Sequence, residues 1–257
     1  MSAAADAAAR ALDAVRALTI GGAAQALPHP RGTLLRSPDE PRAFVANQLL
    51  LDRSADLDAR GLIAVLDEAL DGFGHRRAVI TDDAEGARLH AALLPHGWGG
   101  GAQVVMVLAP DAPPAAIGVA DVPVAPEARV RAVGLRSDVA SGLEPAVAEQ
   151  LARVRARERA ARGARGVVVA VDGQDAAHAT LHRTGQVFQI EDVVTLPPYR
   201  GRGLARRVIA SCVREARAQG AELVVIVADA DDSPRELYAR MGFAPVARLW
   251  VVQREVL

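Results

Sequence analysis

The residues best suited to chemistry form the glycine-rich segment 199–203 (YRGRG), which follows a strand pattern and precedes a helix pattern. Its two glycines allow a tight turn and let a ligand approach the main-chain amides. No conventional capping side chain precedes the helix, so its first N–H groups and the helix dipole offer a partial positive charge. Arg202, Arg206 and Arg207 add positive charge around the turn. The segment therefore predicts a binding site for a polyphosphate.

The composition excludes several other kinds of site. All 30 cationic residues are arginine, so a P-loop with its lysine is excluded, and the Gly-x-Gly-x-x-Gly pattern of a Rossmann dinucleotide site is absent. The formal net charge of −1 lacks the basic excess of a nucleic-acid-binding protein. Cys212 is the only cysteine, which excludes disulfides within the chain and zinc sites built from cysteines. His75, His90 and His96 show no metal-ligand spacing, so no metal is expected.

The spacing around the glycine turn resembles that of a known family. Arg200-x-x-Gly203-x-Ala205 is similar to the [Gln/Arg]-x-x-Gly-x-[Gly/Ala] acyl-CoA signature of the GNAT superfamily of acetyl-CoA-dependent N-acetyltransferases. A strand leading into Pro-x-Tyr-Arg-Gly stands upstream, and a Leu-Tyr-x-x-x-Gly-Phe segment begins at Leu237, in the family's order. The resemblance covers residues 128–253 well and the first half of the chain only in outline.

The resemblance implies a mode of binding for coenzyme A. The main-chain N–H groups of residues 200–205 would hold the pyrophosphate. The strand before the turn would pair with the pantetheine arm and offer an amide to the thioester carbonyl, which is oxyanion-type stabilisation. In the family this strand splays from its parallel neighbour, here residues 222–227, and opens a slot for the cofactor. The predicted binding residues are Val193, Val194, Thr195, Leu196, Arg200, Gly201, Arg202, Gly203, Leu204, Ala205 and Arg206.

Two side chains match the family's catalytic positions. Tyr238 matches its tyrosine acid, which would protonate the departing thiolate, because a phenol with a pKa of about 10 keeps its proton. Glu191 matches a glutamate that acts as a base directly or through water. Asp192 should point to the opposite face of the strand, so only one of these two carboxylates should face the slot, and which one is the base stays open. A structural or surface role is the simpler alternative for each.

Three further reactive side chains are expected to pack rather than react. Cys212 lies on the apolar stripe of the helix pattern at 203–219. His178 and His182 have the same parity on the strand predicted at 176–182 and could line the substrate side of the sheet, but packing is the expected role.

The elements that position these residues form two similar halves. Residues 78–108 and 222–252 share the order strand, acidic turn, helix, Gly-aromatic pair, strand. This self-similarity suggests two related modules, although independent elements with common turn chemistry would look alike. We therefore expect an α/β fold, with a mixed twisted sheet flanked by helices, built as a tandem of GNAT-like modules.

The first module is expected to lack a cofactor site. Its counterpart of the phosphate-binding turn, residues 52–58 (DRSADLD), contains three carboxylates and no glycine, and would repel a pyrophosphate. Leu93 stands where the second half has Tyr238, which leaves no acid.

Local patterns divide the chain into four parts. Residues 1–18 should form a surface helix, and ordered structure should begin only at Ala43, because four prolines interrupt the residues between them. A strand is expected at 128–134. The four parts are an N-terminal helix and loop (1–42), a degenerate GNAT-like half (43–108), a linker with five prolines (109–127) and a catalytic GNAT domain (128–257).

The sequence favours an N-acetyltransferase that moves an acetyl or short acyl group from acyl-CoA to a primary amine. Direct attack in a ternary complex is expected, because no cysteine is placed for a covalent intermediate. Acetyl-CoA is the expected donor, and the acceptor is a small-molecule or peptide amine whose pocket draws on the first half. A catalytically silent acyl-CoA-binding or regulatory module is the alternative, and a protein that retains ATP or NAD is a third possibility.

The partners expected are few. Neither nucleic acid nor a membrane is among them, since no apolar run approaches the ~18 residues of a membrane span. The first residues lack the apolar stretch of a signal peptide. We expect a cytoplasmic protein that is a monomer or a homodimer.

Overall fold

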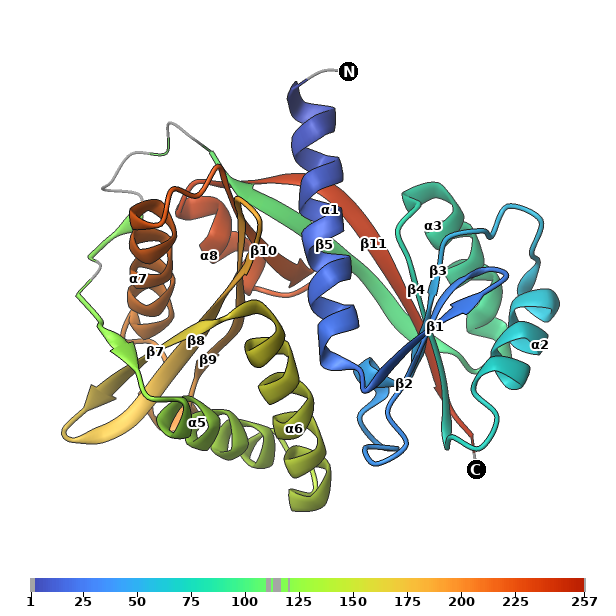
Figure 1. Cartoon of the computed structure of the whole chain (residues 1–257), viewed down its shortest axis with the longest axis horizontal. Helices are drawn as coiled ribbons and strands as arrows, with labels where there is room; N and C mark the ends of the chain where they lie inside the picture. The colour runs from blue at the N-terminus through green and yellow to red at the C-terminus, as the bar shows by residue number, and fades with distance from the viewer. Residues whose placement is uncertain (1–2, 110–111, 113–116, 120, 257) are drawn as a thin grey trace.

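The computed structural model describes residues 3–109, 112, 117–119 and 121–256. In this part of the chain, eleven strands form one mixed sheet with helices packed on both faces (Figure 1). The α/β fold class expected from the sequence is thereby confirmed. In chain order, the elements are α1 (Ala3–Gly22), β1 (Gln25–His29), β2 (Gly32–Arg36), β3 (Gln48–Leu51), α2 (Ala59–Ala69), β4 (His75–Ile80), α3 (Asp83–Leu93), β5 (Gly99–Leu108), β6 (Val124–Ala125), α5 (Glu127–Ala140), α6 (Pro145–Arg162), β7 (Arg165–Val171), β8 (Gln174–Thr184), β9 (Val187–Thr195), α7 (Leu204–Ala218), β10 (Leu223–Asp229), α8 (Pro234–Arg240) and β11 (Phe243–Glu255).

The two halves of the sheet repeat one arrangement and exchange a strand. The strand order is β1-β2-β3-β4-β11-β5-β10-β9-β8-β7-β6. β3 and β4 are parallel in the first half, as β9 and β10 are in the second. β11 lies between β4 and β5, and β5 lies between β11 and β10, so that these two long strands cross the centre of the molecule in Figure 1. The halves thus share the predicted element order within one sheet, and their descent from one module stays a prediction.

The N-terminal helix α1 is part of the core, contrary to the expectation of a surface helix. Along β5, alternate side chains face opposite sides of the sheet, as the period of a strand requires. Val105 and Val107 pack in a cluster with Ala11 and Ala14 of α1, which are 0% and 2% exposed. Small alanine side chains let the helix lie close to the sheet, so an alanine-rich pattern did not by itself reveal its burial.

Ordered structure begins well before Ala43. β1 and β2 form an antiparallel hairpin in which Pro28 stands opposite Thr33. β1 is the edge strand of the sheet, and an edge strand tolerates proline because one row of its N–H groups needs no partner. The predicted loop was wrong because a proline-rich pattern does not distinguish a loop from an edge strand.

The strand expected at 128–134 is the first half of helix α5. Val130, Val133 and Gly134 are buried together on α5, with the i, i+3, i+4 spacing of a helix face. The strand in this region is limited to β6. The alternation of apolar and arginine residues over a few positions fitted both periods, and packing against α6 and β8 selects the helix.

Part of the predicted linker 109–127 packs along α7. Its residues 110–111, 113–116 and 120 lie outside the described residues. Ile117 and Val122 belong to the core cluster that includes α7. The Val122 amide donates to Ser211 Oγ of α7 at 3.1 Å. The described part of this connection is therefore held against the second half of the sheet.

Candidate active site

The predicted polyphosphate-binding turn has a left-handed conformation just before α7. Gly201 and Gly203 have φ angles of 76° and 73°, a region that favours glycine. No side chain of the described residues caps the first turn of α7, so its N–H groups are available to a ligand. A cavity of about 450 Å³ lies at this turn. It is lined by Thr195, Arg200, Gly201, Gly203, Leu204, Ala205, Arg206, Leu237 and Arg240.

Four of the predicted binding residues do not line this cavity. Val193 lines a larger cavity nearby. Leu196 is buried, and Val194 packs against the same small cluster. The Arg202 guanidinium lies 5.7 Å from the centre of the Tyr199 ring. The structure therefore brings together the turn and the start of α7, while the side chains of Val193, Val194 and Leu196 face packed surroundings or the larger cavity.

The charge of Arg207, expected to add to the turn, is matched by a carboxylate. Arg207 Nη2 and Asp121 Oδ2 form an ion pair at 2.8 Å. This pair ties α7 to the segment that follows β5.

β9 and β10 diverge beside the turn. Their parallel pairing ends at Ile190 and Ile226. Beyond this point β9 continues along β8 as far as Thr195, while β10 continues along β5 as far as Asp229. The facing edges of the two strands therefore open toward α7, which is the arrangement that a slot for an extended ligand requires.

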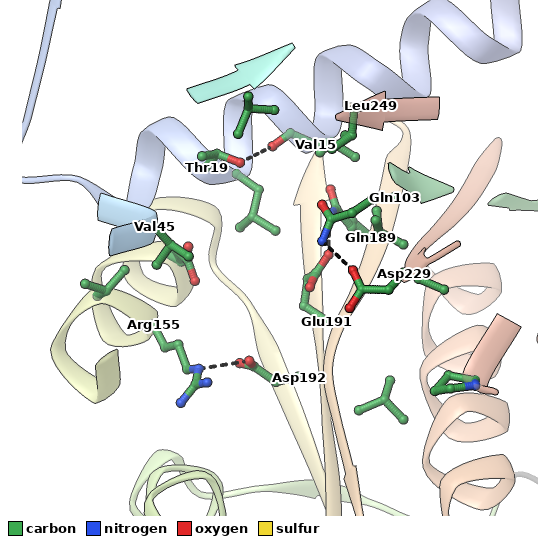
Figure 2. Close-up of a pocket in the computed structure, with 18 of the residues that line it drawn as sticks. Val15, Thr19, Val45, Gln103, Arg155, Gln189, Glu191, Asp192, Asp229 and Leu249 are labelled. Atoms are coloured by element: carbon green, nitrogen blue, oxygen red, sulfur yellow. Dashed lines mark hydrogen bonds and ion pairs between the residues drawn. The ribbon is translucent and has the colours of Figure 1, made fainter. Parts of the chain in front are cut away.

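A larger cavity of about 560 Å³ lies beside the diverging strands, between the two halves of the sheet (Figure 2). Helices α1 and α6 contribute to its walls. Side chains of the first half line part of it. The lining residues are Val15, Leu18, Thr19, Val45, Gln48, Arg77, Val79 and Gln103 from the first half, and Leu151, Val154, Arg155, Glu158, Gln189, Glu191, Asp192, Val193, Val227, Ala228, Asp229, Asp232, Pro234, Tyr238 and Leu249 from the second.

Glu191 lines this larger cavity and has the electrostatics of a base. Burial raises the pKa of its carboxyl to about 7, and the neighbouring Asp192 adds to the rise. Gln189 Nε2 donates a hydrogen bond to Glu191 Oε1 at 2.5 Å, which opposes the rise. A carboxylate with a pKa near neutrality can accept a proton and release it again at neutral pH.

Tyr238 lines the same cavity from α8. It is 6% exposed, and its ring packs against Phe243 with 6.3 Å between the ring centres. Burial raises the pKa of the phenol, and the carboxylates of Glu191 and Asp232 raise it further. The hydroxyl therefore keeps its proton at neutral pH and can donate it.

Both Glu191 and Asp192 line the cavity, so the expectation that only one of them could was wrong. Asp192 has a φ angle of 51°, and the pairing of β8 with β9 shifts its register at this level. Such a bulge interrupts the alternation of side chains along a strand. In Figure 2, Glu191 points toward Gln103 and Asp229, whereas Asp192 points toward Arg155.

Asp192 is held as an ionised partner of α6. Its Oδ1 lies 3.0 Å from Arg155 Nε. Burial acts to raise the pKa of Asp192, but Arg155, His178 and His182 together with Arg159 outweigh it, and the pKa is lowered. An aspartate that stays ionised beside an arginine is a poor proton acceptor, which leaves Glu191 as the candidate base.

His178 and His182 are packed side chains. Each is 2% exposed, and neither lines the two cavities described above. Burial lowers the pKa of both imidazoles to about 4, so both are neutral at neutral pH. His182 Nε2 lies 3.0 Å from Thr180 Oγ1. Cys212 is likewise buried, at 1% exposure.

In the first half, the segment that corresponds to the turn before α7 is residues 52–58, and its carboxylates already have partners within the protein. Asp58 Oδ1 accepts a hydrogen bond from the Gly61 amide at 2.7 Å and caps α2. Asp56 forms an ion pair with Arg31, and Asp52 forms one with Arg16. These carboxylates thus cap the start of α2 or pair with arginines of the protein itself.

Helix α6 and strand β4 also line the larger cavity, which was not predicted from the sequence. Leu151, Val154, Arg155 and Glu158 line it from one face of α6. Their i, i+3, i+4, i+7 spacing is the signal that could have identified this face. Burial raises the pKa of Glu158 to about 8. Arg77 of β4 has no comparable signal, because its position depends on strand pairing.

The described residues contain no group of three or more His, Cys, Asp or Glu side chains that could hold a metal ion. None of the helices in the described part of the chain combines the length and the apolar character that a membrane crossing requires.

Sequence comparisons find acetyltransferases that are similar to the second half. Residues 135–243 match the model described as the acetyltransferase (GNAT) family. A curated relative, glucosamine 6-phosphate N-acetyltransferase 1 of Oryza sativa subsp. japonica, is 34% identical over 110 residues. The aligned residues are 38% of this chain and 66% of that relative.

Solved structures share the fold of both halves together. A GCN5-related N-acetyltransferase from Kribbella flavida has a TM-score of 0.62 at 20% identity, covering 96% of this chain and 95% of its own. A functionally unknown conserved protein from Staphylococcus epidermidis ATCC 12228 has a TM-score of 0.68 at 13% identity, covering 90% of this chain and 93% of its own. The arrangement of the whole sheet therefore recurs in other proteins.

Proposed function

Since residues 135–243 match the model of the acetyltransferase (GNAT) family, we propose that this chain transfers an acetyl or short acyl group from acyl-CoA to a primary amine. The observation that carries the proposal is the position of the diverging strands β9 and β10. Glu191 and Tyr238 lie in a cavity beside them, and the uncapped turn before α7 lies at their open end.

The turn before α7 fits the diphosphate of coenzyme A. A Cβ placed on Gly201 or Gly203 meets no described atom within 4 Å, so a ligand has room to approach the main chain there. The amides at the start of α7 would hold the diphosphate, and Arg200 and Arg206 line the same cavity. When bound, acetyl-CoA supplies the acyl group as a thioester.

The side chains in the larger cavity account for the proton transfers of a direct attack. The Glu191 carboxylate takes a proton from the acceptor ammonium, which frees the nitrogen lone pair to bond to the acyl carbon. The carbon–sulfur bond breaks, and the Tyr238 hydroxyl gives its proton to the departing sulfur. The second proton that the bonded nitrogen must lose then passes to the Tyr238 oxygen, which restores the phenol and leaves a neutral amide. A main-chain N–H of Val193–Leu196 donates to the carbonyl oxygen as negative charge develops on it.

The charge of the larger cavity favours a cationic acceptor. Carboxyl groups outnumber guanidinium groups along its wall, which raises the local concentration of amines through electrostatic attraction. The carboxyl groups are those of Glu191, Asp192, Asp229 and Asp232, apart from Glu158, whose raised pKa of about 8 leaves it mostly neutral, and the guanidinium groups are those of Arg77 and Arg155.

The test is release of free thiol from acetyl-CoA in the presence of a panel of amines. Glucosamine 6-phosphate belongs in the panel because the rice relative is named for acting on it. We expect thiol release that depends on the amine and saturates with it. If coenzyme A binds but none of the amines causes thiol release, a non-catalytic acyl-CoA-binding module would be favoured.

A thermal-shift comparison of coenzyme A, ATP and NAD tests the identity of the nucleotide. A ligand present at about 100 times its Kd stabilises the folded state by ~2.7 kcal/mol. We expect such a shift with coenzyme A at concentrations where ATP and NAD give none. A larger shift with ATP or NAD would contradict the proposal.

A further inference from the structure

Arg77 brings into the larger cavity a positive charge that no described carboxylate neutralises through an ion pair. It lies on β4 and is half-buried. Its Nε donates to Gln48 Oε1 at 2.9 Å, and its Nη1 donates to Gln253 Oε1. Within the described part of the chain, its Nη2 has no hydrogen-bond partner. Two neutral amides thus hold the guanidinium in place without cancelling its charge.

The other arginine of the cavity is in a different situation. Arg155 forms ion pairs with Asp138 at 2.5 Å and with Asp192 at 3.0 Å. For Arg77, burial lowers the pKa to about 10, and the nearby Asp229 offsets this only in part. Asp229 Oδ1 itself accepts a hydrogen bond from Gln103 Nε2 at 2.9 Å. Arg77 therefore stays charged at neutral pH but lacks the counter-charge that burial demands.

We propose that the acceptor amine carries an acidic oxygen group, a carboxylate or a phosphate, which binds Arg77. This assignment rests on the proposed acyl transfer and names the acceptor class for the same cavity. A guanidinium suits such a group because its N–H donors lie in one plane and match two oxygens at once.

The acidic group and the amine of this acceptor should lie at opposite ends of the acceptor. Arg77 is on β4 and Glu191 is on β9, and three strands, β11, β5 and β10, lie between these two. With about 4.8 Å between neighbouring strands, an α-amino acid is too short to reach both side chains. An ω-amino acid fits better. Gln189, whose Oε1 has no partner among the described residues, lines the cavity beside Glu191 and can accept a hydrogen bond from the acceptor ammonium.

The first test compares matched acceptors with the wild-type protein. 6-Aminohexanoate and 8-aminooctanoate are compared with their neutral amides, and glycine is compared with glycinamide. We expect kcat/KM for the long acids to exceed that for their amides roughly 10-fold or more, the worth of one charge-assisted hydrogen-bond pair. Glycine should show no advantage over glycinamide. 6-Aminohexyl phosphate is the arm that distinguishes a phosphate from a carboxylate acceptor.

The second test removes the charge. In Arg77→Gln, the KM for 6-aminohexanoate should rise to that of its amide, while the KM for the amide, kcat and the Kd for coenzyme A stay unchanged. Arg77→Lys should retain part of the preference. Arg248→Gln is the matched control, because Arg248 is exposed on β11 and lines neither cavity. A merely structural role for Arg77 would instead raise KM for acid and amide alike.

The outcomes separate the two proposals. Equal kcat/KM for long acids and their amides, or a preference that survives Arg77→Gln, overturns the role of Arg77 while acetylation of the amides leaves the acyl transfer standing. If Arg77→Gln does not fold, the wild-type comparison decides alone. Binding of coenzyme A without turnover of any amine overturns the proposed function, and the acceptor assignment falls with it.

Discussion

At the scale of single residues, burial raises the pKa of both Glu191 and Tyr238, but the chemical result differs between the two. The pKa of each side chain is raised because burial disfavours its charged form. For the carboxyl group, a pKa of about 7 creates a base suited to neutral pH. For the phenol, the rise keeps the proton in place until a thiolate needs it. One environment thus supports an acid and a base.

Tyr238→Phe should lower kcat about 100-fold or more and leave the Kd for coenzyme A unchanged. The substitution removes only the hydroxyl and retains the ring that packs against Phe243. The expected loss is that of a general acid. Rapid-quench or thiol-release kinetics measure kcat, and titration measures the Kd. An unchanged kcat would remove Tyr238 from the mechanism.

The pH dependence of kcat/KM should report Glu191. The base must be ionised, so kcat/KM should fall tenfold per pH unit below about 7 and level off above it. Glu191→Gln should lose both most of the activity and this acidic limb. An acidic limb that persists unchanged in the Gln variant would assign the titration to another group.

Glu191 should also make stability depend on pH. Its pKa is about 7 when folded and 4.5 as a model group, so the folded state binds the proton more tightly. The free energy of unfolding should therefore fall as pH rises from about 4.5 to about 7. Glu191→Gln cannot ionise, so its Tm relative to wild type should be higher at pH 8 than at pH 4.5. Thermal unfolding at the two pH values measures the difference.

At the scale of elements, the turn before α7 depends on backbone conformation rather than on side chains. Gly203→Ala should weaken coenzyme A binding about tenfold, because an L-residue resists the φ of 73° and shifts the amides. Gly185→Ala is the matched control, with a φ of 61° and equally open surroundings in the β8–β9 hairpin. Both variants should lose ~1 kcal/mol of stability, and only Gly203→Ala should lose affinity.

At the scale of the whole molecule, the exchanged strand links the two halves in folding. β5 lies between β10 and β11, so residues 128–257 alone would leave both strands without it. We expect this fragment not to fold into a stable, coenzyme A-binding unit by itself, and co-expression with residues 1–127 to restore binding. Thermal unfolding and coenzyme A titration test this. A stable fragment that binds coenzyme A would show that the predicted catalytic domain folds independently.

The sequence by itself determined the features that depend on neighbouring residues. The glycines at 201 and 203 and the helix start at Leu204 lie within a few positions, so their backbone conformations can be inferred from residue types. The repeat of strand, helix and strand in both halves was equally local. The turn at 199–203 contains two glycines and no carboxylate, whereas its counterpart at 52–58 contains three carboxylates and no glycine, and this difference in composition already separated their predicted roles.

Only the tertiary structure decided which elements and side chains that are distant in the sequence lie next to one another. The exchange of β5 and β11, the burial of α1 and the position of Arg77 beside Gln253 join residues far apart in the chain, and no local period encodes such pairing. Asp192 illustrates the same limit within one strand. Its left-handed φ and its ion pair with Arg155 depend on β8 and α6, so alternation along β9 alone gave the wrong answer.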